Sequence, residues 1–173
     1  LGAIVMRGAG CTLNDIVDRN YDGRVARTKG RPIPSGRVSV KQALIFLAAQ
    51  ALLGLAILLQ FNSHTVVLAM TSLLIVAIYP FMKRITNWPQ LVLGLAFNWG
   101  VLVGWSAVHG SRSWPPVLVY LGGIFWTLAY DTIYAHQDRE DDVLIGVKST
   151  AVHFGDNTRI WLGGFFILAL ISI

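Results

Sequence analysis

The chain has 173 residues, of which 54% are hydrophobic and only 13% are charged, and its formal net charge is +5 at pH 7. Its mean hydropathy of +0.58 lies outside the range typical of soluble globular domains, which excludes a soluble all-helical enzyme. In so apolar a chain, the excess of positive charge indicates anionic lipid or a phosphorylated substrate and not a nucleic acid.

Six apolar segments predict an all-α membrane protein with a single domain over residues 1–173. Most approach the roughly 20 residues that a helix needs to cross a bilayer. The loops between them are rich in Gly, Pro and Ser, and the two prolines in residues 30–36 exclude a continuous helix there. Because the chain starts at Leu1 and stops inside an apolar run, we expect the domain to be incomplete at both ends. The segments are residues 1–17, 40–60, 64–82, 91–109, 115–135 and 160–173.

The positions of the charges predict how these segments cross the membrane. If the segments cross alternately, three long loops lie on one side and two short loops on the other: residues 18–41, 83–90 and 136–159 against residues 61–64 and 110–115. Every Lys and Arg outside the segments except Arg112 then lies on the first side, which the positive-inside rule assigns to the cytoplasm or the matrix. All nine Asp and Glu residues lie at this same face, so acidic residues from distant parts of the chain can meet there. We interpret a cluster in the first loop mainly as part of this signal: Arg24, Arg27, Lys29 and Arg31.

The carboxylates are concentrated in a first acidic run, residues 14–22, and a second acidic run, residues 138–142. Asn14, Asp18 and Asp22 are four residues apart, so on a helix their Cβ atoms form one stripe at roughly 5–6 Å spacing. Asp138 and Asp142 repeat this spacing. Like charges at this spacing repel one another, and desolvating carboxylates near a membrane is costly, so a bound cation would explain both runs. Mg²⁺ prefers oxygen ligands and keeps phosphate and water as further partners, which makes these five residues candidate ligands.

The remaining acids are weaker candidates for the metal site. Asp131 precedes Asp138 by seven residues and would share its face on a continuous helix. Asp15, Glu140 and Asp141 lie off the two stripes, where a solvated or capping role explains them equally well. A single DxxxD pattern is more often a solvated helix edge, but two such patterns at one face of a chain with few acids favour the metal site.

Basic and polar side chains near the same face could bind the rest of a phosphorylated ligand. Tyr79, Lys83 and Arg84 close the third segment. Tyr79 and Lys83 are four residues apart and so share one side of a helix; Lys83 suits phosphate, whereas the Arg84 fork suits a carboxylate. An aromatic-belt tyrosine and positive-inside cations are the alternative. Arg7 lies inside the first segment, where a charge is costly unless it faces a cavity or an anion. Asn98, within the fourth segment, either faces the cavity or bonds to a neighbouring helix.

Together these motifs resemble those of the UbiA superfamily of intramembrane prenyltransferases. The resemblance covers nearly the whole chain and is carried by GCTLNDIVDRNYDGRVARTKGRPIPSG, YPFMKR and YDTIYAHQDREDDVLIGVKSTAVHFG. The parts DTIYAHQDREDD and GVKST are most similar to the branch that prenylates 4-hydroxybenzoate in ubiquinone synthesis. The resemblance implies a bundle of roughly nine transmembrane helices around a central cavity, of which the first helix and the last two are missing from this chain.

The resemblance also implies a reaction, the Mg²⁺-dependent transfer of a polyprenyl group from polyprenyl diphosphate to 4-hydroxybenzoate, at the ring carbon ortho to the hydroxyl. Lys83 would stabilise the departing diphosphate, the ring of Tyr79 would face the allylic cation, and Asp138 would assist loss of the ring proton. Arg7 would assist diphosphate binding, and Arg84 would serve the aromatic acid. The ligands of Mg²⁺–diphosphate would be Asn14, Asp18, Asp22, Asp138 and Asp142.

The location follows from the substrate, since a polyprenyl chain already resides in the lipid bilayer. A bacterial plasma membrane and a mitochondrial inner membrane both suit this branch, with the acidic runs on the cytoplasmic or matrix side. One alternative is a UbiA-type enzyme for another acceptor, such as a naphthoate, haem or a tocopherol-type ring, which the second acidic run disfavours. The other is a divalent-cation transporter, which would need acidic residues deep in the membrane along a conduction path, whereas these acids gather at one face.

Overall fold

The computed structural model describes residues 1–110 and 113–173, and every regular element in these ranges is a helix. The predicted all-α fold is therefore confirmed, while the central cavity and the single-domain organisation stay predictions. Arg112, the basic loop residue assigned to the opposite side, lies outside the described residues. The chain forms two compact units, Leu1–Phe61 and Asn62–Ile173.

The first unit is a pair of packed helices, α1 (Gly2–Asp22) and α2 (Val40–Leu58). Glycines allow the two helices to approach closely. A Cβ atom added at Gly8 would overlap the amide of Gln50, and one added at Gly54 would overlap Met6. Small residues at helix contacts are typical of membrane bundles, where close backbone approach replaces the hydrophobic driving force.

The connection between α1 and α2 contains turns and no helix, as its prolines and glycines predicted. Gly36 adopts a positive φ of 75°, which a side chain would disfavour. α2 then begins with a capping box. Ser39 Oγ accepts a hydrogen bond from the backbone N–H of Gln42, and Gln42 Oε1 accepts one from the backbone N–H of Ser39 at 2.9 Å. The start of α2 is thus specified by local sequence.

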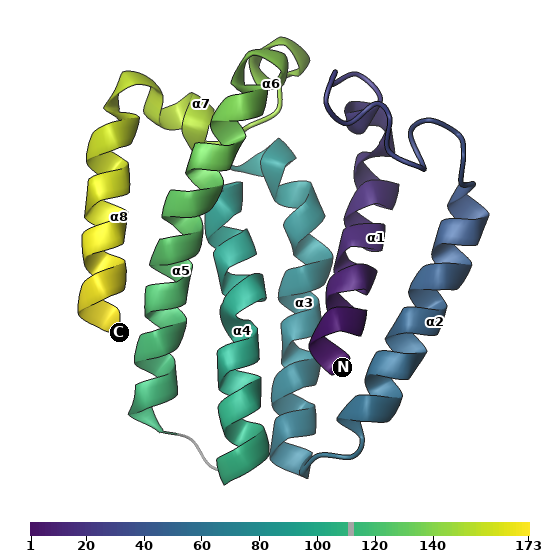
Figure 1. Ribbon diagram of the computed structural model, residues 1–173, viewed down its shortest axis with the longest axis vertical. Coiled ribbons are helices and arrows are strands. Elements are labelled where there is room, and N and C mark those ends of the chain that lie inside the picture. The colour runs from purple at the N-terminus through teal and green to yellow at the C-terminus, as the bar shows by residue number, and fades with distance from the viewer. Residues whose placement is uncertain (111–112) are drawn as a thin grey trace. The chain divides into compact units, whose positions relative to one another are not determined.

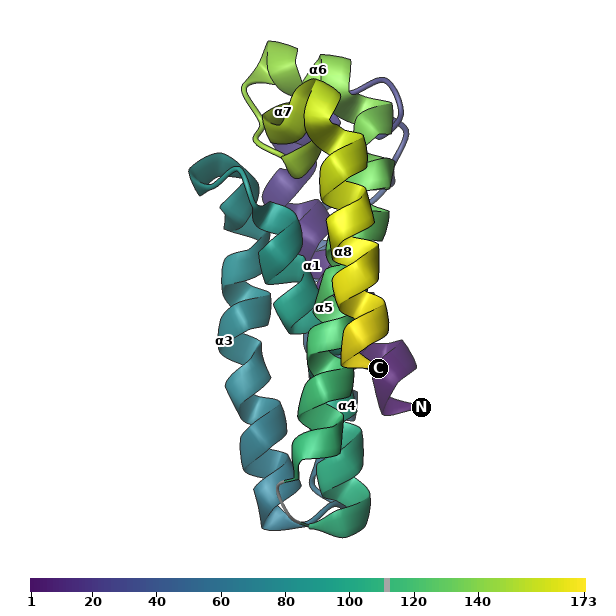
Figure 2. The same ribbon diagram turned by 90° about the vertical axis from the view of Figure 1, so that its left-hand side faces the viewer.

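The second unit contains four long helices that pack in the order α3, α4, α5 and α8 (Figures 1 and 2). Their bounds are Ser63–Ile85 for α3, Pro89–His109 for α4, Trp114–Ala135 for α5 and Thr158–Ser172 for α8. Short elements lead from α5 to α8: η1 (His136–Asp138), α6 (Arg139–Ile145), α7 (Thr150–Phe154) and η2 (Gly155–Asn157). Prolines occupy the first turn of α4 (Pro89) and of α5 (Pro115 and Pro116), where a missing N–H is harmless.

Polar side chains connect the long helices of this unit. Each bond satisfies a polar group that the apolar surroundings would otherwise leave without water. The contacts are Trp99 Nε1 to the Leu68 carbonyl at 2.9 Å, the Tyr120 hydroxyl to the Leu95 carbonyl at 3.0 Å, and the Thr65 and Ser106 hydroxyls to each other at 2.9 Å.

An aromatic cluster fixes the segment that returns from α6 to α8. The Phe154 ring stacks on Trp161 at a centroid distance of 4.7 Å and meets the edge of Trp88 at 5.2 Å. Trp88 in turn lies 5.7 Å from Trp161. The start of α4, the end of α7 and the first turn of α8 therefore share one packed core, with Phe165 beside it.

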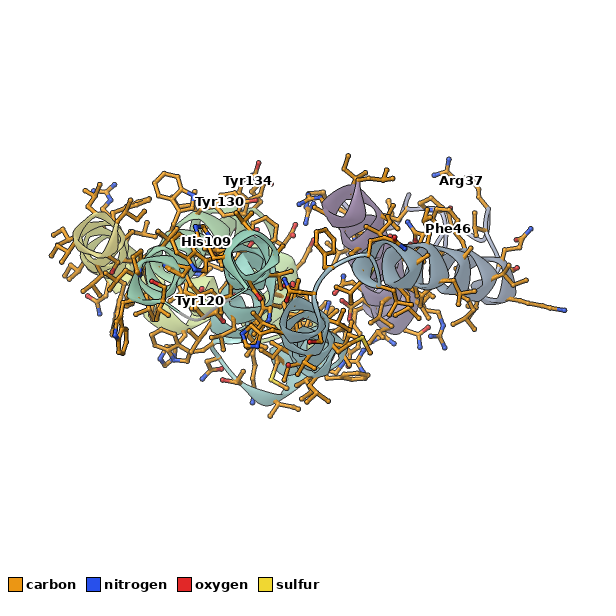
Figure 3. All side chains as sticks on the ribbon, turned by 90° about the horizontal axis from the view of Figure 1, so that it is seen from below. Arg37, Phe46, His109, Tyr120, Tyr130 and Tyr134 are labelled. Carbon is orange, nitrogen blue, oxygen red and sulfur yellow. The ribbon has the colours of Figure 1, made fainter. Side chains whose placement is uncertain are left out.

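Four helical stretches have the length and composition to cross a membrane: Val40–Leu58, Ser63–Ile85, Pro89–His109 and Trp114–Ile145. Large apolar side chains on them are exposed, such as Phe46 at 56% (Figure 3), which suits contact with lipid. Two of the six predicted segments do not meet these criteria. α1 carries charged residues from Arg7 to Asp22, and α8 is only 15 residues long.

Candidate functional site

The first acidic run forms the last turns of α1, so Asn14, Asp18 and Asp22 share one stripe as predicted. Asp18 is 2% exposed and Asp22 is 7% exposed, whereas Asn14 is half-buried. Burying two carboxylates one helical turn apart carries a desolvation cost and a repulsion cost. The arrangement therefore favours a positively charged partner for this stripe.

Arg31 supplies part of that positive charge. Its Nη1 donates to Asp15 Oδ1 at 2.9 Å and to Asp22 Oδ2 at 3.0 Å. Thr28 Oγ1 also donates to the backbone carbonyl of Asp22 at 2.9 Å. The loop after α1 thus folds back onto the acidic end of the helix, and a cation bound through Asp22 Oδ2 would compete with Arg31.

Sequence reasoning underestimated two of these residues. Arg31 was interpreted mainly as a topology signal, yet it joins two acids of the first acidic run. Asp15 was placed off the stripe, and it is held by this ion pair. The chain reversal that brings Arg31 back to α1 lies in the turns of residues 23–31, and Gly23 and Gly30 were the available signal. Arg7 lies on the same helix, is exposed, and keeps its substrate role as a prediction.

The second acidic run does not continue α5 as a regular helix. α5 ends at Ala135, a 3₁₀ turn spans η1, and Asp138 is the N-cap residue of α6 with φ −108° and ψ 7°. The continuous α-helix on which Asp131 and Asp138 were predicted to share a face is therefore interrupted, because a 3₁₀ turn winds with 3.0 residues per turn instead of 3.6. Asp142 lies in the first turn of α6, where the helix dipole stabilises negative charge.

The two acids that were placed off the stripe, Glu140 and Asp141, also lie in the first turn of α6. The helix dipole stabilises negative charge at these positions. His136, which has no partner at ligand spacing in the sequence, bonds through Nε2 to the Thr158 hydroxyl at 3.2 Å and links η1 to α8.

The candidate diphosphate residues Tyr79 and Lys83 lie in the last two turns of α3, one turn apart and on the same side, as predicted. Arg84 follows them, and its guanidinium carbon lies 5.6 Å from the centroid of the Phe81 ring. This cation–π contact draws Arg84 toward its own helix, and the predicted contact with an aromatic acid stays a prediction.

Residues 146–150, here called the GVKST segment, connect α6 with the end of α3. The backbone N–H of Val147 donates to the carbonyl of Asp142 at 2.9 Å, and the next N–H, of Lys148, donates to the carbonyl of Lys83 at 2.9 Å. The second acidic run and the Lys83 end of α3 are thus joined within one unit. This link was not predicted, because backbone carbonyls leave no pattern in a sequence.

Asn98 makes the interhelical bond that was one of its two predicted roles. Its Nδ2 donates to the Gly94 carbonyl and to the Thr127 hydroxyl, each at 2.9 Å. Gly123 on α5 makes room for this amide, because an added Cβ would overlap Asn98. Helix packing therefore explains the polar residue within α4, and the substrate contact assigned to Asn98 is not needed to account for it.

Gly123→Ala is expected to lower the free energy of unfolding by about 1–3 kcal/mol, because its Cβ forces the Asn98 amide out of place. Thermal unfolding of the purified protein in detergent measures the change. Gly104→Ala is the matched control, since nothing lies within 4 Å of a Cβ added there. It should be neutral or stabilising, by up to about 1 kcal/mol. Equal destabilisation by both variants would contradict this role of Gly123.

On α5, the neighbouring rings of Tyr130 and Tyr134 meet edge to face at a centroid distance of 5.2 Å (Figure 3). Both side chains are about half exposed, and they flank Asp131 in the sequence. This aromatic surface lies on the helix that leads into the second acidic run.

The donor chemistry of the two acidic runs fits Mg²⁺. Each run offers carboxylate or amide oxygens, the ligands that Mg²⁺ prefers, and the ligand set contains no thiolate or imidazole of the kind favoured by zinc. Within residues 1–110 and 113–173, no three His, Cys, Asp or Glu side chains are grouped closely enough to hold a metal ion. The two runs belong to different units of the chain, so their common site stays a prediction.

Comparison with known proteins agrees with the family that the sequence motifs resemble. The profile of the UbiA prenyltransferase family matches residues 1–173. Proteins named "4-hydroxybenzoate polyprenyltransferase, mitochondrial" match at 58% identity in Aedes aegypti, 56% in Homo sapiens and 59% in Arabidopsis thaliana. These matches cover 95%, 98% and 95% of this chain, but the chain spans only 37%, 46% and 40% of those proteins.

Several solved structures share the fold, among them two UbiA homologs. A UbiA homolog from Aeropyrum pernix K1, in its apo form, superposes with a TM-score of 0.85 at 25% identity, covering 98% of this chain and 65% of that chain. A UbiA homolog from Archaeoglobus fulgidus bound to GPP and Mg²⁺ superposes with a TM-score of 0.73 at 22% identity, covering 99% and 63%.

Proposed function

Because the chain belongs to the UbiA prenyltransferase family, we propose that it carries the diphosphate-binding part of a 4-hydroxybenzoate polyprenyltransferase of ubiquinone biosynthesis. The observation that carries this proposal is the stripe of buried carboxylates at the end of α1 in a chain otherwise poor in acids. The names of relatives at 54–59% identity support the acceptor.

Both acidic runs act on one Mg²⁺–diphosphate in this proposal. Asn14, Asp18 and Asp22 hold it from α1, and Asp138 and Asp142 hold it from the η1–α6 region. Bound Mg²⁺ would supply the Lewis acidity that neutralises charge on the leaving group. The Archaeoglobus homolog, which is bound to GPP and Mg²⁺, supports the same ligand chemistry.

Other side chains of this protein have separate roles in the transfer. Lys83 holds the diphosphate and stabilises its charge as the allylic C–O bond breaks, with Arg7 assisting. Tyr79 presents its ring face to the allylic cation, and apolar side chains exclude water from it. The ring carbon ortho to the hydroxyl of 4-hydroxybenzoate forms the new C–C bond, Asp138 assists removal of the ring proton, and Arg84 binds the acceptor's carboxylate.

We place this protein in a membrane, where the prenyl tail of its substrate is dissolved. The four apolar helices support this location. The names of the relatives favour the mitochondrial inner membrane over a bacterial plasma membrane. The clustering of Lys and Arg favours the matrix side for both acidic runs.

An acceptor panel tests the proposed function. The full-length protein in detergent or liposomes is given geranyl diphosphate and Mg²⁺ with 4-hydroxybenzoate, a dihydroxynaphthoate or homogentisate, and the prenylated products are quantified. We expect product from 4-hydroxybenzoate and at least about 10²-fold less from the others, because a site that pairs a carboxylate and a hydroxyl rejects rings that misplace them. EDTA should abolish the product. Transfer to another ring with none to 4-hydroxybenzoate would favour the alternative acceptor.

A further inference from the structure

The end of α3 is held by one lysine that the proposed mechanism leaves unused. A helix leaves the carbonyl groups of its last turn without donors from the helix itself. Lys148 satisfies two of them, because its backbone N–H donates to the Lys83 carbonyl at 2.9 Å and its Nζ donates to the Ile85 carbonyl at 3.1 Å. A positive charge at a helix C-terminus also interacts favourably with the helix dipole.

The segment that carries Lys148 is anchored at its start to the second acidic run. Gly146 ends α6 with a positive φ of 73°, which turns the chain out of the helix. Val147 and Lys148 then direct consecutive backbone N–H groups to two different partners, the carbonyl of Asp142 and the carbonyl of Lys83. A proposed metal ligand and the proposed diphosphate-binding lysine are therefore joined through two adjacent peptide groups.

The far end of the GVKST segment is buried and hydrogen-bonded. Thr150 donates its backbone N–H to Gln90 Oε1 at 3.1 Å, and its hydroxyl lies 2.6 Å from the hydroxyl of Thr132. Both threonines are 0% exposed. The segment is thus fixed to α4 and α5 at this end, and Lys148, which is itself exposed, is the point at which it reaches α3.

We propose that Lys148 is a positioning residue that fixes the Lys83 end of α3 against the second acidic run, so that Lys83 and Asp142 approach the diphosphate together. This inference rests on the proposed function. The backbone bond from residue 148 survives any substitution other than proline, whereas the Nζ bond to Ile85 depends on the side chain. Losing that bond frees the last turn of α3, two residues beyond Lys83, and small misplacements at a reacting group can cost up to about 10²-fold in rate.

The test compares three variants of the full-length protein. Lys148→Met keeps roughly the length of the side chain but removes its hydrogen-bond donor, and Lys148→Arg keeps a donor. Lys41→Met is the control, because it removes an exposed lysine at the start of α2. We expect Lys148→Met to lower kcat/KM for the prenyl diphosphate about 10-fold while KM for 4-hydroxybenzoate changes less than about twofold. Lys148→Arg should recover most of the loss, and Lys41→Met should match the wild type.

Two further measurements separate positioning from folding and from the choice of acceptor. The melting temperature of Lys148→Met should stay within about 2 °C of the wild type, since a single exposed bond contributes little to stability. The Mg²⁺-dependent affinity for geranyl diphosphate, which requires no acceptor, should fall in Lys148→Met and recover in Lys148→Arg. If the wild type binds geranyl diphosphate but prenylates no 4-hydroxybenzoate, the proposed acceptor fails and the binding comparison still decides the role of Lys148.

Three outcomes would overturn the inference. Wild-type kinetics and affinity in Lys148→Met would show that the Nζ bond positions nothing. A melting temperature lowered by more than about 4 °C, together with equal losses toward both substrates, would make Lys148 a structural residue. Failure of Lys148→Arg to recover any affinity would show that hydrogen bonding to the end of α3 is not what the side chain supplies.

Discussion

Asp18→Asn in the full-length protein is expected to lower kcat/KM for the prenyl diphosphate by at least about 10³-fold, which corresponds to roughly 4 kcal/mol of lost transition-state stabilisation. Asp18 is the most deeply buried acid of the first acidic run, at 2% exposure. The asparagine keeps the volume of the side chain and removes the charge that would bind Mg²⁺. Steady-state prenylation of 4-hydroxybenzoate at saturating Mg²⁺ measures the loss.

Asp156→Asn is the matched control for this substitution. Asp156 lies in η2, is exposed, and belongs to neither acidic run. It should retain activity within about twofold, because the charge of an exposed acid outside both acidic runs is strongly screened by water and salt. If Asp18→Asn kept more than a tenth of the wild-type kcat/KM, Asp18 would not be a ligand of the reacting diphosphate.

Lys83→Met is expected to lower kcat about 10²-fold and to raise KM for the prenyl diphosphate, because the ammonium group both binds the diphosphate and stabilises the charge that develops as it departs. The backbone carbonyl of Lys83 still accepts the N–H of Lys148 in this variant, so the end of α3 keeps its anchor. Single-turnover kinetics with geranyl diphosphate separates the binding step from the chemical step.

A second variant shows whether the effect of Lys83→Met comes only from the loss of one positive charge. Lys41→Met removes the same charge from an exposed position at the start of α2 and should leave both kinetic constants unchanged. The melting temperature of Lys83→Met should match that of the wild type within about 2 °C. If Lys83→Met raised only the KM for 4-hydroxybenzoate, Lys83 would bind the acceptor and not the diphosphate.

Local pattern was sufficient to predict the long helices of this protein. Their observed bounds, such as Val40–Leu58 and Pro89–His109, follow the apolar segments because hydrophobic length, capping residues and prolines act within a few residues of one another. The stripe of Asn14, Asp18 and Asp22 could be predicted for the same reason, since α1 continues without interruption to Asp22.

Local pattern did not predict the break between α5 and α6. The second acidic run has the same four-residue spacing as the first, so helical periodicity was applied across residues 131–142. Asp138 instead ends a 3₁₀ turn and is the N-cap residue of α6, and the chain turns out of α6 at Gly146 on its way to α7. The packing of Trp88, Phe154 and Trp161, which are distant in sequence, accompanies this return.

The roles of single polar residues depended on partners that no pattern identifies. Asn98 had two interpretations until Thr127, 29 residues away, was found to bond to it. Arg31 and Lys148 both appeared to be topology signals, and both make specific bonds, one to carboxylates and one to helix-terminal carbonyls. Such bonds follow from tertiary structure, and a cation at a membrane face has the same sequence signal with or without them.

The central claim is that two acidic runs more than a hundred residues apart act on a single Mg²⁺–diphosphate, and a double-mutant cycle tests it most directly. The Mg²⁺-dependent affinity of the full-length protein for geranyl diphosphate is measured by calorimetry for the wild type, Asp18→Asn, Asp138→Asn and the double variant. If both residues serve one site, the loss in the double variant should be smaller than the product of the two single losses by at least about tenfold. If the loss in the double variant instead equals the product of the two single losses to within about twofold, the two runs act at independent sites, which would contradict the account.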